Sequence, residues 1–237
     1  MESLSQKYQL QLDQIWNREV FKSDPIISKY INRGYAFPHI GKATTLFVGL
    51  NPAGREEKGQ SFIYEREQAV NDHPNYYGKY DQLALKADID WSYLDLFYFK
   101  ETDSNIVDDF LKHPVAIQFL IEQLKVTQAI IEEISPKVIV VFNAKARKFF
   151  GLEQNRDKNE GIWMGYLAND KILNQKFGTP VISEVESGII NGIKHKKQAP
   201  IPIFFDSFIT YQPVAAMDRL AWHINYARNL IENAQQI

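Results

Sequence analysis

Polar side chains follow or interrupt short apolar runs at four points of the sequence. These are Asn51-Pro52 after 44–50, Asp95 within 91–99, Asn143 after 137–142, and Asp206-Ser207 after 201–205. A short uninterrupted apolar run with turn residues beside it is typical of a strand buried on both faces, as in a parallel sheet. Ligands of such sheets bind beyond the carboxyl ends of the strands. We therefore expect these polar side chains to meet in one site.

The turn at Asn51-Pro52 has the best-defined geometry of the four. Pro52 fixes its own φ and forces the residue before it into an extended conformation. Asn51 is then held at a strand end, where its amide oxygen can hold a water molecule. An asparagine is a very poor base, so any catalysis here would depend on positioning. The alternative is an asparagine that only caps the loop.

The remaining elements follow from periodicity and from the placement of proline. We expect helices over 4–31 (interrupted at Pro25), 107–135, 144–150 and 213–231, a polar loop over 53–80, and a polar insertion at about 152–199 with one or two short strands. The alternation of helices and strands predicts an α/β fold, a three-layer α/β/α sandwich around a mostly parallel four-stranded sheet. We expect one domain over 1–237, with an N-terminal helical segment at 1–43.

Composition excludes several classes of protein. The 237 residues carry a net charge of −2, so binding of nucleic acid would need a local basic patch. The absence of cysteine excludes disulfides, thiolate zinc sites and cysteine-ligated iron–sulfur clusters. The histidines are scattered, so we expect no metal and no cofactor. No secretory signal and no membrane-spanning apolar run is found, so we expect a cytoplasmic protein without membrane contact.

A family resemblance appears at the first strand end. Gly49-Leu50-Asn51-Pro52 resembles the first motif of the uracil-DNA glycosylase superfamily, which reads Gly-x-Asn-Pro in its mismatch-specific and single-strand-selective branches. The segments 138–151 and 203–223 are compatible with that family's middle strand and with its last strand, motif loop and closing helix. The resemblance covers most of the chain from about residue 44 to 230.

The resemblance implies a role for several residues. Asn51 would hold the attacking water, while the damaged base is flipped out of the stack into a pocket formed in part by Gly49, Leu50 and Pro52. Either Phe62 or Tyr64 would stack on the base, or both would only pack the loop. Further candidates for base contacts are Asn143 and Asp95. Asp95 stands where the family often has an asparagine, and an ionised aspartate cannot donate a hydrogen bond to a carbonyl oxygen.

The last motif departs from the family pattern. Many members carry His-Pro-Ser there, with the histidine supporting the leaving base, whereas this chain reads Asp206-Ser207-Phe208-Ile209-Thr210-Tyr211-Gln212-Pro213. Ser207, Thr210 or Gln212 would have to donate instead. His223, on the closing helix, is expected to be a packing residue. Candidates for phosphate contacts are Arg55, Lys58, Lys145 and Arg147, with the run Lys194–Lys197; the alternative is a solvated face.

These residues predict a monomeric, monofunctional DNA glycosylase acting on a damaged or deaminated base. One alternative is a catalytically inactive nucleic-acid-binding member of the same fold, consistent with the missing histidine and with Asp95. Another is a hydrolase of small molecules or nucleotides on a similar sandwich, consistent with the near-neutral charge.

Overall fold

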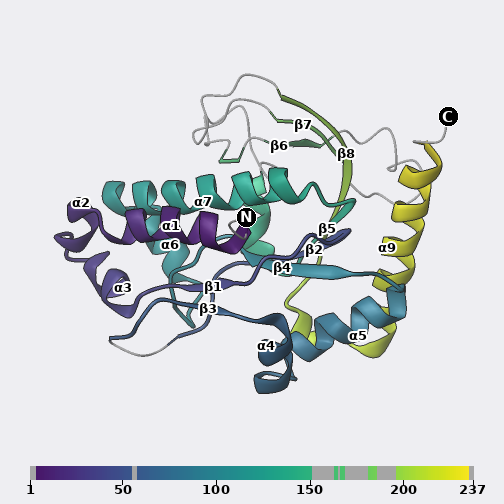
Figure 1. Cartoon of the computed structure of the whole chain (residues 1–237), viewed down its shortest axis with the longest axis horizontal. Coiled ribbons are helices and arrows are strands. Elements are labelled where there is room, and N and C mark those ends of the chain that lie inside the picture. The colour runs from purple at the N-terminus through teal and green to yellow at the C-terminus, as the bar shows by residue number, and fades with distance from the viewer. Residues whose placement is uncertain are drawn as a thin grey trace.

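A computed structural model describes residues 4–54, 58–150, 163–164, 166–168, 181–185 and 196–234 (Figure 1). Helices and strands alternate along most of this chain. In order, the elements are α1 (Leu4–Trp16), α2 (Glu19–Lys22), α3 (Ser28–Arg33), β1 (Ala36–Pro38), β2 (Thr45–Gly49), β3 (Phe62–Tyr64), α4 (Arg66–Asp72), α5 (Tyr77–Ala87), β4 (Trp91–Asp95), α6 (Ile106–Phe110), α7 (Pro114–Ile134), β5 (Val138–Val141), η1 (Ala144–Phe150), β6 (Tyr166–Ala168), β7 (Val181–Val185), β8 (Lys196–Phe205), η3 (Ile209–Tyr211) and α9 (Val214–Ala234).

The main sheet has the strand order β4-β2-β5-β8-β7-β6. β4, β2, β5 and β8 run parallel, whereas β7 and β6 are each antiparallel to the preceding neighbour in that order. The prediction of an α/β fold with a mostly parallel sheet is confirmed. The expected count of four strands is wrong, because the polar segment 152–199 contributes β6, β7 and the first residues of a long β8. A separate parallel pair is formed by β1 and β3.

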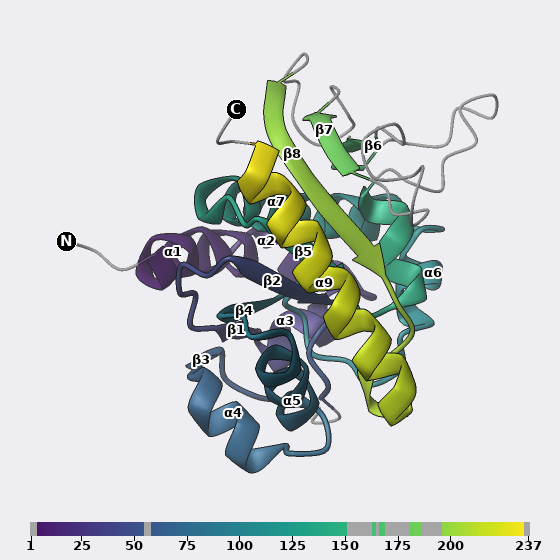
Figure 2. The same ribbon diagram turned by 90° about the vertical axis from the view of Figure 1, so that its right-hand side faces the viewer.

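Helices pack against both faces of the parallel strands (Figure 2). Neighbouring residues of a strand point to opposite faces. Leu46 and Val48 of β2 join a core with side chains of α1 and α7, whereas Phe47 belongs to a second core with side chains of α5 and α9. All five residues of β2 are therefore buried, which explains its uninterrupted apolar sequence.

Two helical predictions are wrong in their boundaries because polar caps interrupt them. In the N-terminal segment the expected interruption at Pro25 is present, but a second break after Trp16 gives three helices. Oδ1 of Asp24 accepts hydrogen bonds from the backbone of Ile26 and Ile27 at 2.9 Å. In the second segment, α6 ends before His113, which caps α7, and Pro114 occupies the first turn of that helix. Proline is well tolerated there because the first amide hydrogens of a helix have no partner within it.

The segment 53–80, expected to be a polar loop, contains β3, α4 and the beginning of α5. The segment is mostly polar, but it also contains aromatic residues at helical spacing. Tyr76 and Tyr80 lie one helical turn apart and pack with Tyr93 of β4. This packing places a row of tyrosines over the end of the sheet where the predicted site lies.

Candidate functional site

A cavity of about 390 Å³ lies beyond the carboxyl ends of the parallel strands. Its wall brings together segments that follow β2, β5 and β8, together with residues from the α4–α5 connection and the segment after β4. From these segments, and from the first residue of α5 and the middle of β4, the cavity is lined by Leu50, Asn51, Pro52, Phe142, Asn143, Phe208, Thr210, Tyr76, Tyr77, Tyr93, Glu101 and Ser104, among others. The structure thus brings Asn51 and Asn143 to one cavity, as expected for parallel strands.

The side chain of Asn51 is held by two backbone carbonyl groups. Its Nδ2 donates to the carbonyl oxygen of Glu101 at 2.6 Å and to that of Pro52 at 3.1 Å. Because a carbonyl oxygen only accepts, this arrangement defines which end of the amide faces the backbone. Oδ1 is left as an acceptor and takes no hydrogen bond from the described residues. The turn itself is held by the amide of Glu101, which donates to the Pro52 carbonyl at 2.9 Å.

Glu101 is in turn fixed by a largely buried ion pair with Arg33. Nη1 of Arg33 lies 2.8 Å from Oε2 of Glu101, and the side chains are 7% and 14% exposed. The same nitrogen donates to the carbonyl oxygen of Lys100 at 3.2 Å. Burial raises the pKa of Glu101, but hydrogen bonds from the backbone of Asp103 and from Arg33 outweigh it, so the pKa is lowered overall. Nothing in the sequence pattern points to this pair.

Asp95 does not line the cavity; Tyr93, two residues earlier on β4, does. Oδ1 of Asp95 accepts from the Tyr93 hydroxyl at 2.7 Å, and its buried Oδ2 has no hydrogen-bond partner among the described residues. Burial raises the pKa of Asp95 to about 7, against a smaller lowering by the Tyr93 hydrogen bond. A β-carbon on Gly49 would overlap both Asp95 Oδ1 and the Tyr93 hydroxyl. The predicted residues Gly49 and Asp95 therefore support the wall and do not form its surface.

Five hydrogen-bonded tyrosines extend this wall, and of these only Tyr64 was among the site residues predicted from the sequence. The hydroxyl of Tyr80 donates to that of Tyr76 at 3.0 Å, and the Tyr76 and Tyr93 hydroxyls are also 3.0 Å apart. Tyr77 donates to Tyr64 at 3.1 Å. Burial is the main cause that raises the pKa of each of these phenols. The signal available in the sequence was the helical spacing of Tyr76 and Tyr80.

The two predicted stacking residues lie beside the main cavity. Phe62 and Tyr64 line an adjoining cavity of about 270 Å³, which shares Pro52, Ala53, His73 and Tyr77 with the main one. Phe62 is about half exposed, with Nζ of Lys100 5.2 Å from its ring centre. The ring that stacks within the main cavity's wall is Phe208, whose centre lies 5.2 Å from that of Tyr76.

In the loop after β8, Thr210 lines the cavity, whereas Ser207 and Gln212 do not. Nε2 of Gln212 donates to Oγ of Ser207 at 2.5 Å and to Oδ1 of Asp206 at 2.7 Å. These two predicted donors hold the loop together. Of the three candidates in this loop, only Thr210 is at the cavity.

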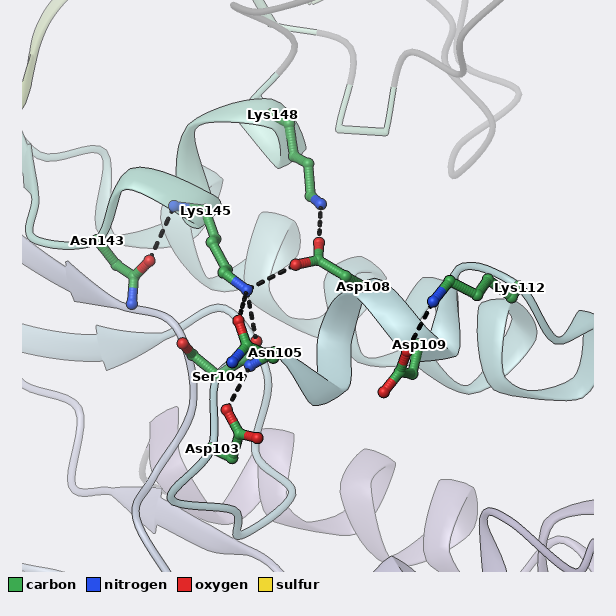
Figure 3. Close-up of polar contacts among 9 residues, drawn as sticks. All are labelled: Asp103, Ser104, Asn105, Asp108, Asp109, Lys112, Asn143, Lys145 and Lys148. Atoms are coloured by element: carbon green, nitrogen blue, oxygen red, sulfur yellow. Dashed lines mark hydrogen bonds and ion pairs between the residues drawn. The ribbon is translucent and has the colours of Figure 1, made fainter.

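The side-chain oxygen of Asn143 is hydrogen-bonded to the turn that follows this residue. Its Oδ1 accepts from the backbone amide of Lys145 at 2.9 Å, and its nitrogen points away from that turn (Figure 3). Because Asn143 also lines the cavity, its Nδ2 is a candidate donor toward a ligand.

Lys145 is paired within the chain. Its Nζ lies 2.6 Å from Oδ2 of Asp108 and 2.7 Å from Oδ1 of Asn105, and Lys148 contacts the other oxygen of Asp108 at 2.8 Å (Figure 3). Hydrogen bonds from both lysines lower the pKa of Asp108 to about 2.

The other basic candidates are more dispersed. The guanidinium of Arg147 lies 5.5 Å from the centre of the Phe205 ring, and Lys58 is exposed. Arg55, Lys194 and His195 lie outside the described residues. His223 is partly buried, and its ring stacks on that of Phe204 at 6.1 Å, in agreement with a packing role.

No cluster of histidine, aspartate and glutamate in the described part of the chain is arranged to hold a metal ion. None of the described helices is both long and apolar enough to cross a membrane. No protein-family model matches the chain, and comparison with curated protein sequences finds no match.

Proposed function

We propose that this chain is a DNA glycosylase of the uracil-DNA glycosylase type, built as a three-layer α/β/α sandwich. The observation that carries the proposal is the position of Asn51. It follows a central parallel strand, lines a cavity of about 390 Å³, and has both amide hydrogens directed to backbone carbonyls. Cavities of this order accommodate small organic ligands, so a single flipped base is a suitable occupant.

In the proposed reaction, Oδ1 of Asn51 accepts a hydrogen bond from the water that attacks the sugar. The asparagine does not remove a proton at the start, because the glycosidic bond breaks first: the base leaves with the bonding electron pair as an anion, and water attacks the cationic sugar that remains. The proton that this water then loses goes to the departed base anion or to solvent. The main catalytic need is then to stabilise the departing base. Nδ2 of Asn143 and the hydroxyl of Thr210 are donors at the cavity wall that suit this task.

The aromatic wall supplies the apolar part of the proposed pocket. Tyr76 and Phe208 are stacked on each other and both line the cavity. A flipped base loses its stacking partners in the duplex, and aromatic contacts in the pocket offset part of that loss.

The test is to incubate the purified chain with oligonucleotides carrying uracil, hypoxanthine, xanthine or a G·U mismatch, and to measure abasic sites. We expect release from at least one substrate and its loss in Asn51→Ala. The matched control is Asn17→Ala, since Asn17 is an exposed asparagine at the end of α1. Binding of DNA without release would favour the inactive nucleic-acid-binding alternative.

The pairing of Lys145 and Lys148 with Asp108 favours a second candidate, a hydrolase of free nucleosides or nucleotides. Lysines neutralised within the chain contribute less to binding a DNA backbone. Release of base from a free nucleoside, with none from oligonucleotides, would replace the first candidate by this one.

A further inference from the structure

A hydrogen-bonded chain of hydroxyl groups runs from the cavity wall to the buried carboxyl of Asp95. It consists of Tyr80, Tyr76, Tyr93 and Asp95, with oxygen–oxygen distances of 3.0, 3.0 and 2.7 Å. Tyr76 and Tyr93 line the cavity that holds Asn51, whereas Asp95 is 1% exposed and lies behind Tyr93.

The direction of every hydrogen bond in this chain follows from the state of Asp95. A carboxylate only accepts, so the hydrogen of Tyr93 points to Asp95. Tyr93 has no second hydrogen to give, so Tyr76 must donate to Tyr93, and Tyr80 must donate to Tyr76. All three hydroxyl hydrogens are then used within the chain. The phenol oxygens at the cavity wall retain only lone pairs.

We propose that Asp95 is a positioning residue that orients the Tyr93 and Tyr76 hydroxyls, so that this wall of the cavity accepts a hydrogen bond from a ring N–H of the ligand. The proposal rests on the proposed function in one respect, namely that the ligand is a nucleobase. It assigns the wall a preference for an N–H edge over a carbonyl edge, which the sequence resemblance did not supply.

Protonation of Asp95 reverses this preference. The acid can donate to Tyr93, after which Tyr93 can donate to Tyr76, and Tyr76 can donate toward the cavity. Among the described residues, the titratable groups whose pKa is raised by the charge of Asp95 are tyrosines from its own strand, from β3, from the α5 region and from the segment after β4: Tyr93, Tyr64, Tyr76, Tyr77, Tyr80 and Tyr98. Burial raises the pKa of Asp95 to about 7, so the reversal falls near neutral pH.

The orientation is tested without any ligand by NMR of the intact chain labelled at the tyrosine Cζ carbons. Between about pH 5 and about pH 9, the Tyr93 and Tyr76 resonances should shift together with one midpoint, and Asp95→Asn should abolish the shift. Tyr35 is the matched control, because it donates to a different aspartate, Asp13, at 2.6 Å. Its resonance should not follow the Asp95 midpoint. A Tyr76 resonance that ignores the midpoint followed by Tyr93 would overturn the coupled chain.

Recognition of the N–H edge is tested with two probes, 1-methyluracil and 1,3-dimethyluracil, which differ at one ring nitrogen. Calorimetry at about pH 8.5 should give roughly fivefold tighter binding of 1-methyluracil, the worth of about one net hydrogen bond. At about pH 5.5 the ratio should fall, and in Asp95→Asn it should not change with pH. A purely steric effect of the second methyl group would be equal at both pH values and in both proteins.

The outcomes separate this inference from the proposed function. Base binding with a pH-dependent N–H preference, but without abasic sites in DNA, would support the inference while the glycosylase proposal fails. Abasic sites together with a pH-independent preference would do the reverse. Failure of 1-methyluracil, the probe that keeps the ring N–H, to bind would overturn the assigned recognition of a nucleobase.

Discussion

The hydroxyl of Tyr93 donates to Oδ1 of Asp95 at 2.7 Å, in the space that a side chain on Gly49 would occupy. Gly49 is paired with Asp95 across β2 and β4, and Tyr93 and Asp95 point to the same face because they are two residues apart on one strand. The hydrogen bond can therefore form only where the neighbouring strand carries no side chain. This is a packing reason for the glycine of the Gly-Leu-Asn-Pro sequence, independent of any family resemblance.

We predict that Gly49→Ala destabilises the protein by about 1–3 kcal/mol, because the added methyl group overpacks a buried site and displaces the Tyr93–Asp95 hydrogen bond. The measurement is denaturant unfolding. The matched control is Gly41→Ala, because a β-carbon on Gly41 has no neighbouring atom within 4 Å. Equal midpoints for the two variants would contradict the packing account.

Asp95→Asn should change how stability depends on pH. The pKa of Asp95 is raised from 3.8 to about 7 in the folded state, so folding favours the protonated form. The cost of the buried carboxylate is absent below about pH 4 and grows as the pH rises to about 7. At about pH 8 the variant should be more stable than the wild type by up to about 4 kcal/mol, and the difference should vanish in acid. Urea unfolding at both pH values measures it; a constant difference would exclude the raised pKa.

Much of the fold could be predicted from local pattern. The apolar runs at 44–50 and 137–142 are strands because both faces of β2 and β5 are buried. The helix α7 could be predicted from the helical spacing of its apolar residues. The prediction of a polar loop over 53–80 was wrong, because most polar residues of the segment face outward while Val70 and the tyrosines Tyr76, Tyr77 and Tyr80 pack on the core. That outcome depends on contacts with β4, which local pattern does not contain.

The candidate site was predicted in part. Asn51 and Asn143 share a cavity because both follow parallel strands, a rule that needs only the strand assignments. The partners that orient Asn51 could not be found this way. Arg33 and Glu101 are 68 positions apart, and their ion pair depends on how α3 packs beside the segment after β4.

Arg33→Met should lower stability by about 3 kcal/mol, because it leaves the Glu101 carboxylate largely buried without its partner. Thermal or urea unfolding measures the loss. Lys7→Met is the matched control, since it breaks an exposed pair with Glu133 and should cost less than about 1 kcal/mol. Similar losses in the two variants would show that the Arg33 pair does not hold the segment whose carbonyl orients Asn51.

Asp108→Asn should strengthen binding of DNA if the chain binds DNA. The carboxylate engages Lys145 and Lys148 together (Figure 3), and its removal frees two cations near the cavity. The slope of log affinity against log salt should then steepen by roughly one to two counterions. Fluorescence anisotropy over a salt series measures it. The control is Asp109→Asn, which frees the exposed Lys112. An equal change of the salt slope in this variant would show that Asp108 does not restrain DNA binding more than another acidic residue does.

Tyr211→Ala should weaken DNA binding and base release while leaving stability nearly unchanged. Tyr211 is 81% exposed, so folding gains little from its side chain, and its ring centre lies 5.7 Å from that of Phe208 at the cavity wall. An exposed aromatic ring beside a base-sized cavity is suited to stack in the space that a flipped base leaves in the duplex. Loss of such stacking should make the free energy of DNA binding less favourable by about 1–3 kcal/mol. Leu85→Ala is the control, because Leu85 is a comparably exposed apolar side chain, 76%, on α5. Anisotropy and abasic-site assays on both variants measure the difference. If Tyr211→Ala and Leu85→Ala bind DNA equally well, the loop after β8 does not enter the duplex.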